Sequence, residues 1–586
     1  MANIDRFSIV TLIFFFLSTI FVIRPLKFHV RLPVVGRIQL TLGLMSAPII
    51  AIAILWAAQC IGATQIRDGI VGTAGIKPYN ILILFISLAY MAITLDITGV
   101  LQAAAFWVSN RGGNNGRRLF LYFYILLTGV SMIIGNDPVI LSGTAFLAYY
   151  TAAAQLEPLP WLISEFAAAN TASMVLFVGN PTNVVICEGF GINNAAFTAY
   201  TILPFLACSV TCYLGLAFQF RKPKHVPHKL PVSGDLDPRS VLRDPISAWV
   251  GSLLLLTCLV VVIVVSFFHV DVWMVVLPFA VVKFLFDMCW DHFRPKESEA
   301  EDAESAEDPM KSAIRRGMSH HESTITDNQT ARQDLVISEG KRSISMNADL
   351  PSERRENTLS SSMATRVELE EQIPKCSSPV PSQRSSTTTA PQPNNDSQGR
   401  KLFPQTRIKF DAIHARLSRH FPTFFTALPR LPFGLIPFAF SQFILIEGLS
   451  HRGWIDVFGN WLVIASKREM IPTIWLVGVL GVILCNGAGT NIGATILLTK
   501  IVHAANMPPS TNRAAAIALA VASNIGAVSF TFSASLAGLL WDTILKQKKI
   551  NTITQWKFAY WNSIPLLLMT SAGLAIVTAE MVVLYK

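Results

Sequence analysis

Two polar breaks interrupt long apolar stretches of this chain, and each has a weaker counterpart 354 residues further along. The first pair sets Gly135-Asn136-Asp137-Pro138 against Gly489-Thr490-Asn491-Ile492. The second pair sets Asn170 and the run Gly179-Asn180-Pro181-Thr182-Asn183 against Asn524, Ser529, Thr531, Ser533 and Ser535. Unpaired backbone groups find no water among lipid tails, so these breaks must lie against other protein or a solvated cavity.

Composition identifies the environment in which these breaks lie. Only 14% of the 586 residues are charged and 52% are hydrophobic, whereas a soluble domain carries about a quarter charged residues. The chain is therefore expected to be a polytopic membrane protein. The formal net charge of +10 comes mainly from short loops beside apolar runs, which favours membrane orientation over nucleic-acid binding. No P-loop, Rossmann fingerprint or HExxH motif is present, so we expect no enzyme, no cofactor and no metal site.

Eight apolar runs are long enough to cross a bilayer as helices. They lie near 7–23, 40–62, 80–108, 197–220, 247–268, 272–289, 432–465 and 556–582. The longer stretches 160–195 and 512–544 are broken in the middle, which predicts discontinuous spanning helices. The stretches 119–151 and 471–505 break after about 15 apolar residues, too few for comfortable spanning, and this pattern indicates re-entrant hairpins.

Basic residues test this arrangement, because cytosolic loops are enriched in Lys and Arg. With ten spans and two hairpins, the main basic clusters all fall on the cytosolic side, at 24–37, 111–118, 221–229 and 546–549. If the stretch 119–151 crossed the membrane instead, the cluster at 221–229 would lie outside. Lys467 and Arg468 fall outside and contradict the rule. On balance, charge favours the hairpins.

The predicted elements pair off into two halves. Residues 1–220 form the first repeat, with five spans and the hairpin 119–151, and residues 221–246 form a cytosolic linker. The second repeat has its first two spans at 247–289 and the remainder at 432–586, with the hairpin 471–505. Five spans in each half give the two halves opposite orientations. We therefore expect an all-α fold built as an inverted repeat, each half with a re-entrant hairpin and a discontinuous helix.

Residues 291–430 differ in composition from the rest of the chain. They begin with an acidic run at 297–302 and continue in Ser-, Thr- and Pro-rich tracts such as 385–389. A segment of this kind cannot bury a core, so we expect a disordered cytosolic insertion. Its basic and aromatic end, 407–430, is suited to contact with an anionic membrane leaflet.

The polar residues of the breaks are the candidate binding site, because broken helices at membrane depth are typical of secondary transporters. N-termini of short helices favour an anion or a polar oxygen, and unwound carbonyl groups favour a cation. The candidate substrate or ion ligands are Asn136, Asp137, Asn170, Gly179, Asn180, Thr182, Asn183, Thr490, Asn491, Asn524, Ser529, Thr531 and Ser533.

Four carboxylates are candidates for coupling transport to an ion: Asp137, Glu165, Glu188 and Asp542. Asp137 is the only carboxylate at either hairpin tip, and a carboxylate at membrane depth is costly unless paired or protonated. A helix-capping role is the alternative for Asp137. Asp96 and Glu447, which flank possible helix breaks at Gly99 and Gly453, could instead pair with a lysine or arginine, and so could Glu165.

Three stretches resemble the arsenite-efflux permease branch of the ion-transporter superfamily: 135–141, Ala168 through Asn183, and Leu445 through Asp456. Sodium/proton antiporters and silicon-efflux transporters share this superfamily, and citrate carriers are more distant. The resemblance covers residues 80–220 and 432–582. It implies a scaffold domain, a transport domain, elevator-like alternating access and a homodimer. It places Asn136, Asp137, Asn180, Thr182 and Asn183 at the site, whereas in the second repeat only Asn491 carries over.

These patterns together predict a secondary transporter of a small inorganic anion or a metalloid oxyanion, arsenite-like and coupled to protons or sodium. The serine-rich insertion favours a eukaryotic plasma membrane or vacuolar membrane, with lipid as the surrounding partner. A citrate-like carrier and a sodium/proton antiporter are alternatives within the same class. A passive channel and a sensor that signals through the insertion are alternatives from other classes.

Overall fold

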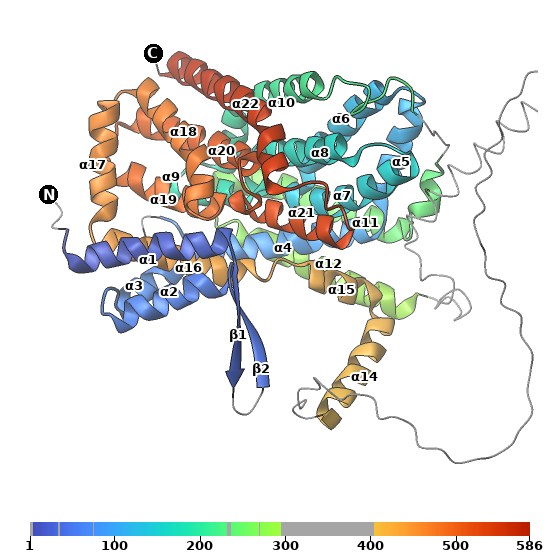
Figure 1. The fold of residues 1–586 in the computed structure, drawn as a ribbon, viewed down its shortest axis with the longest axis horizontal. Coiled ribbons are helices and arrows are strands. Elements are labelled where there is room, and N and C mark those ends of the chain that lie inside the picture. Colours follow the sequence, from blue (N-terminus) through green and yellow to red (C-terminus); the bar gives the residue numbers. More distant parts are fainter. Residues whose placement is uncertain are drawn as a thin grey trace, which may run out of the picture.

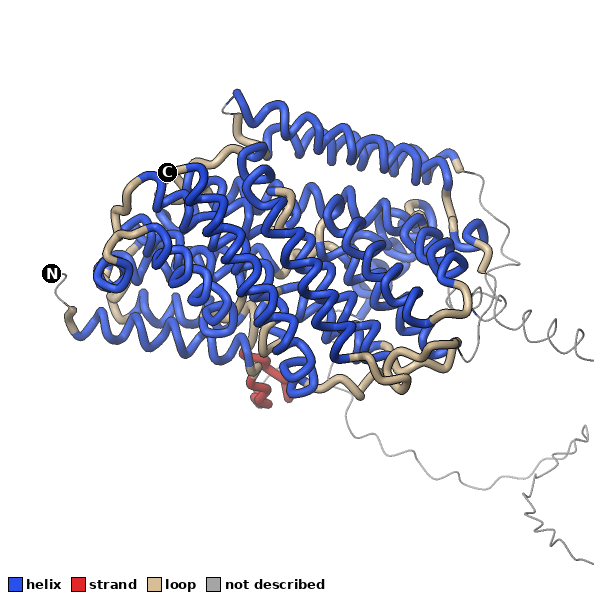
Figure 2. Tube along the Cα trace, turned by 90° about the horizontal axis from the view of Figure 1, so that it is seen from above, coloured by secondary structure: helices blue, strands red, loops and turns tan. Residues whose placement is uncertain are grey.

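Long apolar helices make up the body of the protein, and most run along its long axis in two perpendicular views (Figures 1 and 2). The computed structural model describes residues 4–32, 36–73, 75–230, 236–268, 270–294, 314 and 404–585. Within these residues, nine helices are long and apolar enough to cross a membrane. The chain is therefore a polytopic helical membrane protein, as its composition predicts.

The elements of the first half follow one another with short connections. They are α1 (Arg6–Ile23), β1 (Leu26–Leu32), β2 (Gly36–Leu42), α2 (Ser46–Ala57), α3 (Ala63–Val71), α4 (Pro78–Ile97), α5 (Val100–Gly112), α6 (Gly116–Ile134), α7 (Asn136–Ala153), α8 (Pro158–Ala172), the 3-10 turn η1 (Phe177–Gly179), α9 (Pro181–Phe190) and α10 (Asn194–Gln219).

The second half begins after the linker, which holds the short turn η2 (Pro238–Val241). Its elements are α11 (Pro245–Val265), η3 (Ser266–Phe268), α12 (Trp273–Phe293), α14 (Pro404–His420), α15 (Pro422–Ala427), η4 (Leu428–Arg430), α16 (Leu435–His451), α17 (Trp454–Ser466), α18 (Met470–Gly487), α19 (Asn491–Ala504), α20 (Pro509–Ile525), η5 (Gly526–Val528), η6 (Phe532–Ala534), α21 (Leu536–Gln547) and α22 (Gln555–Leu584).

The prediction of an all-α fold is wrong at one place. Residues of β1 and β2 form an antiparallel hairpin, with Leu26 opposite Leu42 and Leu32 opposite Gly36, and the hairpin extends away from the body in Figure 1. The sequence alternates side-chain types with period two on both arms, which is the strand pattern. The helix predicted over 40–62 is consequently shorter and runs from Ser46 to Ala57.

Equivalent elements in the two halves have matching boundaries. Shifted by the 354-residue offset, α5 coincides with α17 at both ends, and each begins after a left-handed glycine, Gly99 with φ +87° and Gly453 with φ +77°. The breaks also correspond, because η1 is followed by α9 as η6 is followed by α21. The second interruption, between Ile525 and Leu536, is longer than the first. A glycine in the left-handed region ends the preceding helix at little steric cost.

The α6–α7 pair begins and ends at the same region of the fold. At its start, the side chain of Asn114 accepts from the backbone N–H of Leu230 over 3.1 Å. After its end, the carboxylate of Glu157 contacts Nδ1 of His225 at hydrogen-bond distance, 2.7 Å. Both contacts reach the same short segment of the linker, so the two ends of the pair lie close together. The helix α6 is nevertheless long and apolar enough by itself to cross a membrane, which differs from the short arm predicted for it. The ends of the α18–α19 pair also lie close together. Thr511, which follows α19, contacts the carbonyl of Arg468, which precedes α18.

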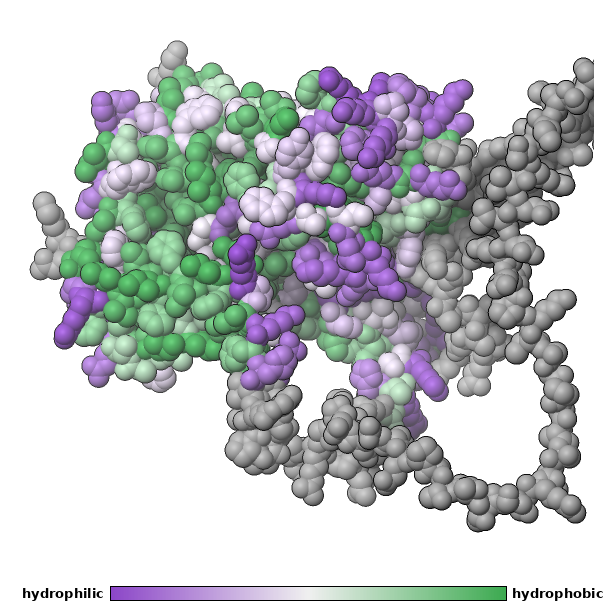
Figure 3. All heavy atoms as spheres, in the orientation of Figure 1, coloured by the Kyte–Doolittle hydropathy of each residue, from purple (hydrophilic) through white to green (hydrophobic). Residues whose placement is uncertain are grey.

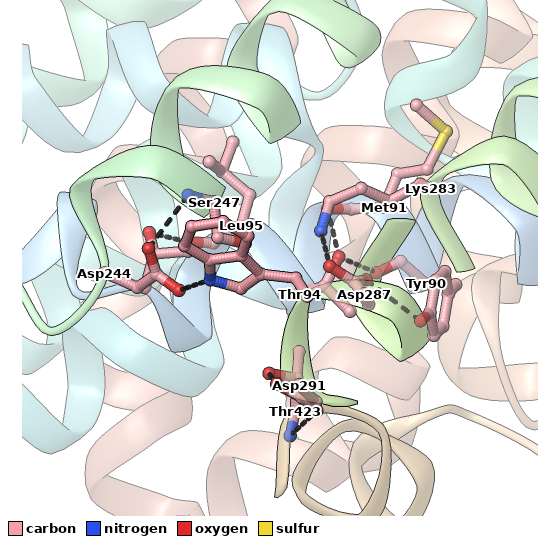
Figure 4. Close-up of polar contacts among 12 residues, drawn as sticks. Tyr90, Met91, Thr94, Leu95, Asp244, Ser247, Lys283, Asp287, Asp291 and Thr423 are labelled. Carbon is pink, nitrogen blue, oxygen red and sulfur yellow. Dashed lines mark hydrogen bonds and ion pairs between the residues drawn. The ribbon is translucent and has the colours of Figure 1, made fainter. Parts of the chain in front are cut away.

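The last residues of the insertion predicted at 291–430 are helical, which differs from the disorder expected for them. Residues 404–430 form α14, α15 and η4, while 295–313 and 315–403 lie outside the described residues. Figure 4 shows why α15 is ordered: Asp291 at the end of α12 accepts from the backbone N–H and the hydroxyl of Thr423, each over 2.9 Å. Phe424 packs edge-on against Phe284 with ring centroids 5.5 Å apart.

The surface of the body is strongly apolar. Hydrophobic side chains cover much of the left part of the face seen in Figure 3, while hydrophilic ones gather at its centre and upper right. On α11, α17 and α22, large apolar residues such as Trp249, Ile464 and Leu567 are more than half exposed. A lipid environment accounts for such exposure, since soluble proteins do not tolerate apolar patches of this extent.

Candidate functional site

Four helix N-termini meet at one small cavity. Its empty volume is about 230 Å³, which includes space open to the surroundings. It is lined by Phe85, Asn136, Asp137, Asn180, Pro181, Asn491, Ile492, Ser535, Leu536 and Ala537. The helix α7 begins at Asn136, α9 at Pro181, α19 at Asn491 and α21 at Leu536. Each of these four helices therefore directs the positive end of its dipole toward the same space. We call this space the central cavity.

The first hairpin tip depends on close backbone approach. Gly135 has φ +85°, and a Cβ built on it would lie 3.1 Å from the carbonyl oxygen of Gly179. The Asn136 amide donates to the side-chain oxygen of Asn170 over 3.0 Å, and Asn170 in turn donates to the carbonyl of Phe166 over 2.8 Å. These contacts fix the tip against the first discontinuous helix. The predicted residue Gly179 thus contributes its backbone carbonyl to the close contact with Gly135, and Asn170 holds the Asn136 side chain by a hydrogen bond.

The first discontinuous helix uses its asparagines in two ways. Asn180 caps α9 by accepting from the backbone N–H of Thr182 over 3.2 Å and also lines the central cavity. Asn183 turns away from the cavity and donates to the carbonyls of Ser173 and Leu176 over 2.8 and 2.9 Å. Both carbonyls lie at the break, and that of Leu176 also accepts from the backbone N–H of Gly179 over 2.9 Å, so Asn183 adds to the backbone hydrogen bonding there.

The second half repeats the capping with different residues. Thr490 accepts from the backbone N–H of Gly493 over 3.4 Å, and Ser535 accepts from that of Gly538 over 3.0 Å. Asn491, the predicted tip residue, lines the central cavity and donates to the carbonyl of Ser523 over 3.2 Å. Ser535 thus occupies the capping position on α21 that Asn180 occupies on α9.

The two halves are joined behind the cavity by a buried polar chain. The hydroxyl of Ser173 donates to the side-chain oxygen of Asn524 over 2.8 Å. The amide of Asn524 then donates to the side-chain oxygen of Asn183, also over 2.8 Å. Thr182 receives a weaker contact from the Ser523 hydroxyl over 3.4 Å. Thr182, Asn183 and Asn524 are fully buried and do not line the cavity, so they support the site rather than face a solute.

Three predicted ligands gather around a residue that sequence reasoning missed. The amide of Asn486 donates to Ser529 over 2.7 Å, and its oxygen accepts from the backbone and the hydroxyl of Thr531 over 3.1 and 2.8 Å. Thr531 and Ser533 contact each other over 3.1 Å. None of these four lines the central cavity. The one available signal for Asn486 was an amide next to a glycine within the apolar stretch 471–505.

Of the four carboxylates proposed for coupling, only Asp137 reaches the central cavity. Glu165 is fully buried between α8 and α7, where both of its oxygens accept from Thr144 over 2.9 and 3.0 Å. Glu188 accepts from the backbone N–H of Lys77 over 3.0 Å. Asp542 forms an ion pair with Lys546 one turn away on the outside of α21.

The alternative assigned to Asp96 and Glu447 is confirmed, because each has a basic partner. The guanidinium of Arg430 lies 3.5 Å from Asp96, and the ammonium of Lys500 lies 2.5 Å from Glu447. Lys500 also donates to the hydroxyl of Thr73 over 2.7 Å. The first pair joins α4 to η4, and the second joins α16 to α19.

The central cavity opens toward residues of the predicted cytosolic ends. An adjoining cavity of about 1130 Å³ shares Phe85, Asn136, Asp137 and Leu536 with it and extends to Arg430. A further cavity of about 1400 Å³ overlaps at Leu141, Pro429, Arg430, Leu540 and Thr543 and is also lined by Asp96, Arg243 and Lys548. We call these two connected spaces the inner vestibule.

A separate cavity of about 1450 Å³ gathers residues of the predicted outer ends, including Lys77, Glu188, Asp271 and Arg513. It shares no lining residue with the central cavity. Lys77 lies 2.9 Å from Asp271 there, and this hydrogen-bonded pairing raises the pKa of Lys77 above its ordinary value. We call this space the outer vestibule.

Comparisons with known proteins find similarity to membrane transporters. The profile of a family described as citrate transporter matches residues 10–292. The arsenical pump membrane protein of Yersinia enterocolitica is 27% identical over 223 residues, which cover 36% of this chain and 50% of that protein. The arsenical pump membrane protein of Escherichia coli is 25% identical over 216 residues, which cover 34% of this chain and 49% of that protein. The chain thus spans about half the length of the curated relatives it matches.

A solved structure, that of the YdaH transporter of Alcanivorax borkumensis, aligns over 99% of both chains with a TM-score of 0.39 and 11% sequence identity. A likeness at that score says nothing about the site. The fold is that of a polytopic helical membrane protein whose interrupted helices meet at a polar cavity. The resemblance to the arsenite-efflux permease branch of the ion-transporter superfamily, predicted from the break motifs, is confirmed by the arsenical-pump and citrate-transporter matches.

Proposed function

We propose that this protein is a secondary transporter of a small inorganic anion or a metalloid oxyanion, arsenite-like in size. The observation that carries the proposal is the meeting of four helix N-termini at the central cavity. A partly buried negative charge at one helix N-terminus gains up to about 2 kcal/mol. Four such ends around one space, with the amides of Asn136, Asn180 and Asn491, favour a small solute bearing negative oxygens.

Alternating access is supported over a passive channel by the arrangement of the cavities. The inner vestibule shares four lining residues with the central cavity, whereas the outer vestibule shares none. Leu84 and Phe177 line the outer vestibule, and they are close in sequence to Phe85 and Asn180, which line the central cavity. A site open to one side at a time is what a carrier needs and an open pore lacks.

An inverted repeat is supported by two observations on the described residues. Elements of the two halves share boundaries at a constant offset, and each half contains a helix pair whose two ends lie together. Five spans per half then give the opposite orientations that the basic loops require. Elevator-like movement and a homodimer follow only from the resemblance to the arsenite-efflux branch and belong to the same proposal.

Coupling to protons is assigned to Asp137. In the described residues, no lysine or arginine forms an ion pair with Asp137. An anion and an unpaired carboxylate repel each other in one small cavity, so an anion binds more tightly once Asp137 carries a proton. Binding of the two is therefore mutually favourable, which is the linkage a coupled carrier uses.

The test is flux in proteoliposomes that contain the full-length protein. Uptake of arsenite, antimonite, borate and citrate is measured separately, with and without an imposed pH or sodium gradient. We expect saturable flux of at least one of these solutes that responds to a gradient. Flux that never saturates and ignores both gradients would instead identify a channel, and no flux of any of them would reject the proposal.

A matched pair of capping variants links this flux to the cavity. Asn180→Ala removes the cap of α9 at the central cavity, whereas Asn115→Ala removes the cap of α6, which accepts from the backbone N–H of Arg118 over 3.1 Å away from the cavity. Both substitutions cost about 1 kcal/mol of helix stability. Only Asn180→Ala should abolish transport. Equal losses in the two variants would mean that the cavity has no special role.

A further inference from the structure

The charged residues of the inner vestibule are unevenly distributed. Arg243, Arg430 and Lys548 line its wider part together with a single carboxylate, that of Asp96. The narrower part adds one more carboxylate, Asp137, where the vestibule meets the central cavity. A solute entering from this side therefore passes a basic region before it reaches the four helix N-termini.

Arg430 is the basic group best placed to contact such a solute. Asp96 is 2% exposed and lies beneath Arg430, while 36% of the Arg430 side chain remains exposed at the vestibule wall. The ammonium group of Lys548 lies over the ring of Tyr149, 4.1 Å from the ring centroid, and donates a hydrogen bond to the Tyr149 hydroxyl. Arg243 is held near the same carboxylate by a backbone bond to Thr98 over 2.9 Å.

The position of Arg430 depends on the ordered segment that returns from the insertion. This segment, Pro422 to Leu431, is fixed by the Asp291–Thr423 contacts visible in Figure 4 and by the packing of Phe424 on Phe284. Tyr90 of α4 packs against the same Phe284 and donates to Asp287 over 3.0 Å. Pro429, Arg430 and Leu431 then form part of the vestibule wall.

We propose that Arg430, assisted by Arg243, forms an entry site that captures the solute as a charged oxyanion before it enters the central cavity. The inference rests on the proposed function and deepens it by naming the charge state of the cargo. A guanidinium donates two parallel N–H bonds to a carboxylate or an inorganic oxyanion and gains from its negative charge. An uncharged metalloid hydroxide would lack the charge-assisted part of these hydrogen bonds, and the basic residues of the vestibule would not attract it electrostatically.

The electrostatic part is tested by thiol labelling of the full-length protein, without any transport measurement. Thr543, which lines both parts of the inner vestibule, is replaced by cysteine in a background that carries Cys289→Ser and Cys376→Ser. The rates of modification by an anionic and a cationic methanethiosulfonate are then compared. We expect the anionic reagent to be favoured, Arg430→Gln to lower the ratio about threefold or more, and Arg430→Lys to preserve it.

Recognition by the guanidinium fork is tested with citrate as a competitor of the anionic label. Citrate should protect Thr543→Cys when Arg430 is present, and protection should fall about tenfold or more in Arg430→Gln and in Arg430→Lys. Ala196→Cys, in the outer vestibule, is the control, and Arg430→Gln should leave its labelling ratio unchanged. An unchanged ratio at Thr543→Cys in Arg430→Gln, or equal citrate protection with and without Arg430, overturns the inference. Absence of flux would reject the proposed function alone, because labelling needs none.

Discussion

The amide of Asn524 donates to the side-chain oxygen of Asn183 over 2.8 Å, and this bond joins the two discontinuous helices across the interface of the two halves. Asn524 and Asn170 occupy equivalent positions at the 354-residue offset, yet their contacts differ. Asn170 receives the tip residue Asn136 of its own half, whereas Asn524 reaches across to the other half. The two halves are thus joined by a hydrogen bond between buried amides.

Loss of the Asn524 amide should weaken the whole interior. Asn524→Ala leaves the Asn183 side-chain oxygen without its donor and removes one of the two acceptors of the Ser173 hydroxyl, and a buried polar group left unpaired costs about 1–3 kcal/mol. Asn512→Ala on the same helix is the control, because Asn512 takes no part in this network. Thermal unfolding in detergent should show a clear drop in Tm for the first variant alone. Equal Tm values would mean that the amide chain does not hold the halves together.

Asp137 should set the pH dependence of solute binding. Because an anion binds more tightly when Asp137 is protonated, binding by the wild type should strengthen as pH falls. Asp137→Asn should bind the same solute with little pH dependence and should lose coupling to a pH gradient while inserting into the membrane normally. Asp542→Asn is the control, since Asp542 forms an ion pair away from the cavity. Coupled transport in Asp137→Asn equal to that of the wild type would remove this residue from the mechanism.

The buried pair of Lys500 and Glu447 should be far more sensitive than an exposed pair. Glu447 is 14% and Lys500 9% exposed at the side chain, and the two are 2.5 Å apart. Lys500→Met should cost about 3–5 kcal/mol, because it leaves a buried carboxylate unpaired. The double variant with Glu447→Met should recover much of that loss. Lys546→Met, which breaks the exposed pair with Asp542, should cost at most about 1 kcal/mol. A double variant as unstable as Lys500→Met would contradict the pairing argument.

Local sequence rules predicted the breaks well because glycine, proline and asparagine act on their own backbone. Gly135 and Gly453 end helices at positive φ, and Pro181 begins α9 after its asparagine cap, as the sequence indicates. The weaker second break was also predicted, although serine at 535 rather than asparagine supplies its cap. These features depend on a few neighbouring residues, so a sequence carries them directly.

The contacts of the site could not be read in the same way, because they depend on which helices meet. Nothing near Asn183 in sequence indicates that its amide donates to the carbonyls of Ser173 and Leu176 instead of binding a solute. Asn486 looked like part of an apolar hairpin, and its two partner residues, Ser529 and Thr531, lie more than 40 residues away. The two-stranded hairpin at 26–42 was missed for another reason, since its basic residues also fit a cytosolic loop.

The approach of Gly135 to Gly179 gives a prediction that separates local strain from loss of the site. Gly135→Ala must place a Cβ 3.1 Å from the Gly179 carbonyl oxygen in a backbone region with φ +85° that alanine rarely adopts. Gly113→Ala meets the same kind of conformational penalty, at φ +59°, but nothing lies within 4 Å of its Cβ. Both variants should lose stability by about 1–3 kcal/mol, as unfolding in detergent would measure. Only Gly135→Ala should also displace the N-terminus of α7 from the central cavity and so raise the KM for solute flux. If the KM rises equally in both, the close contact between the two breaks does not shape the site.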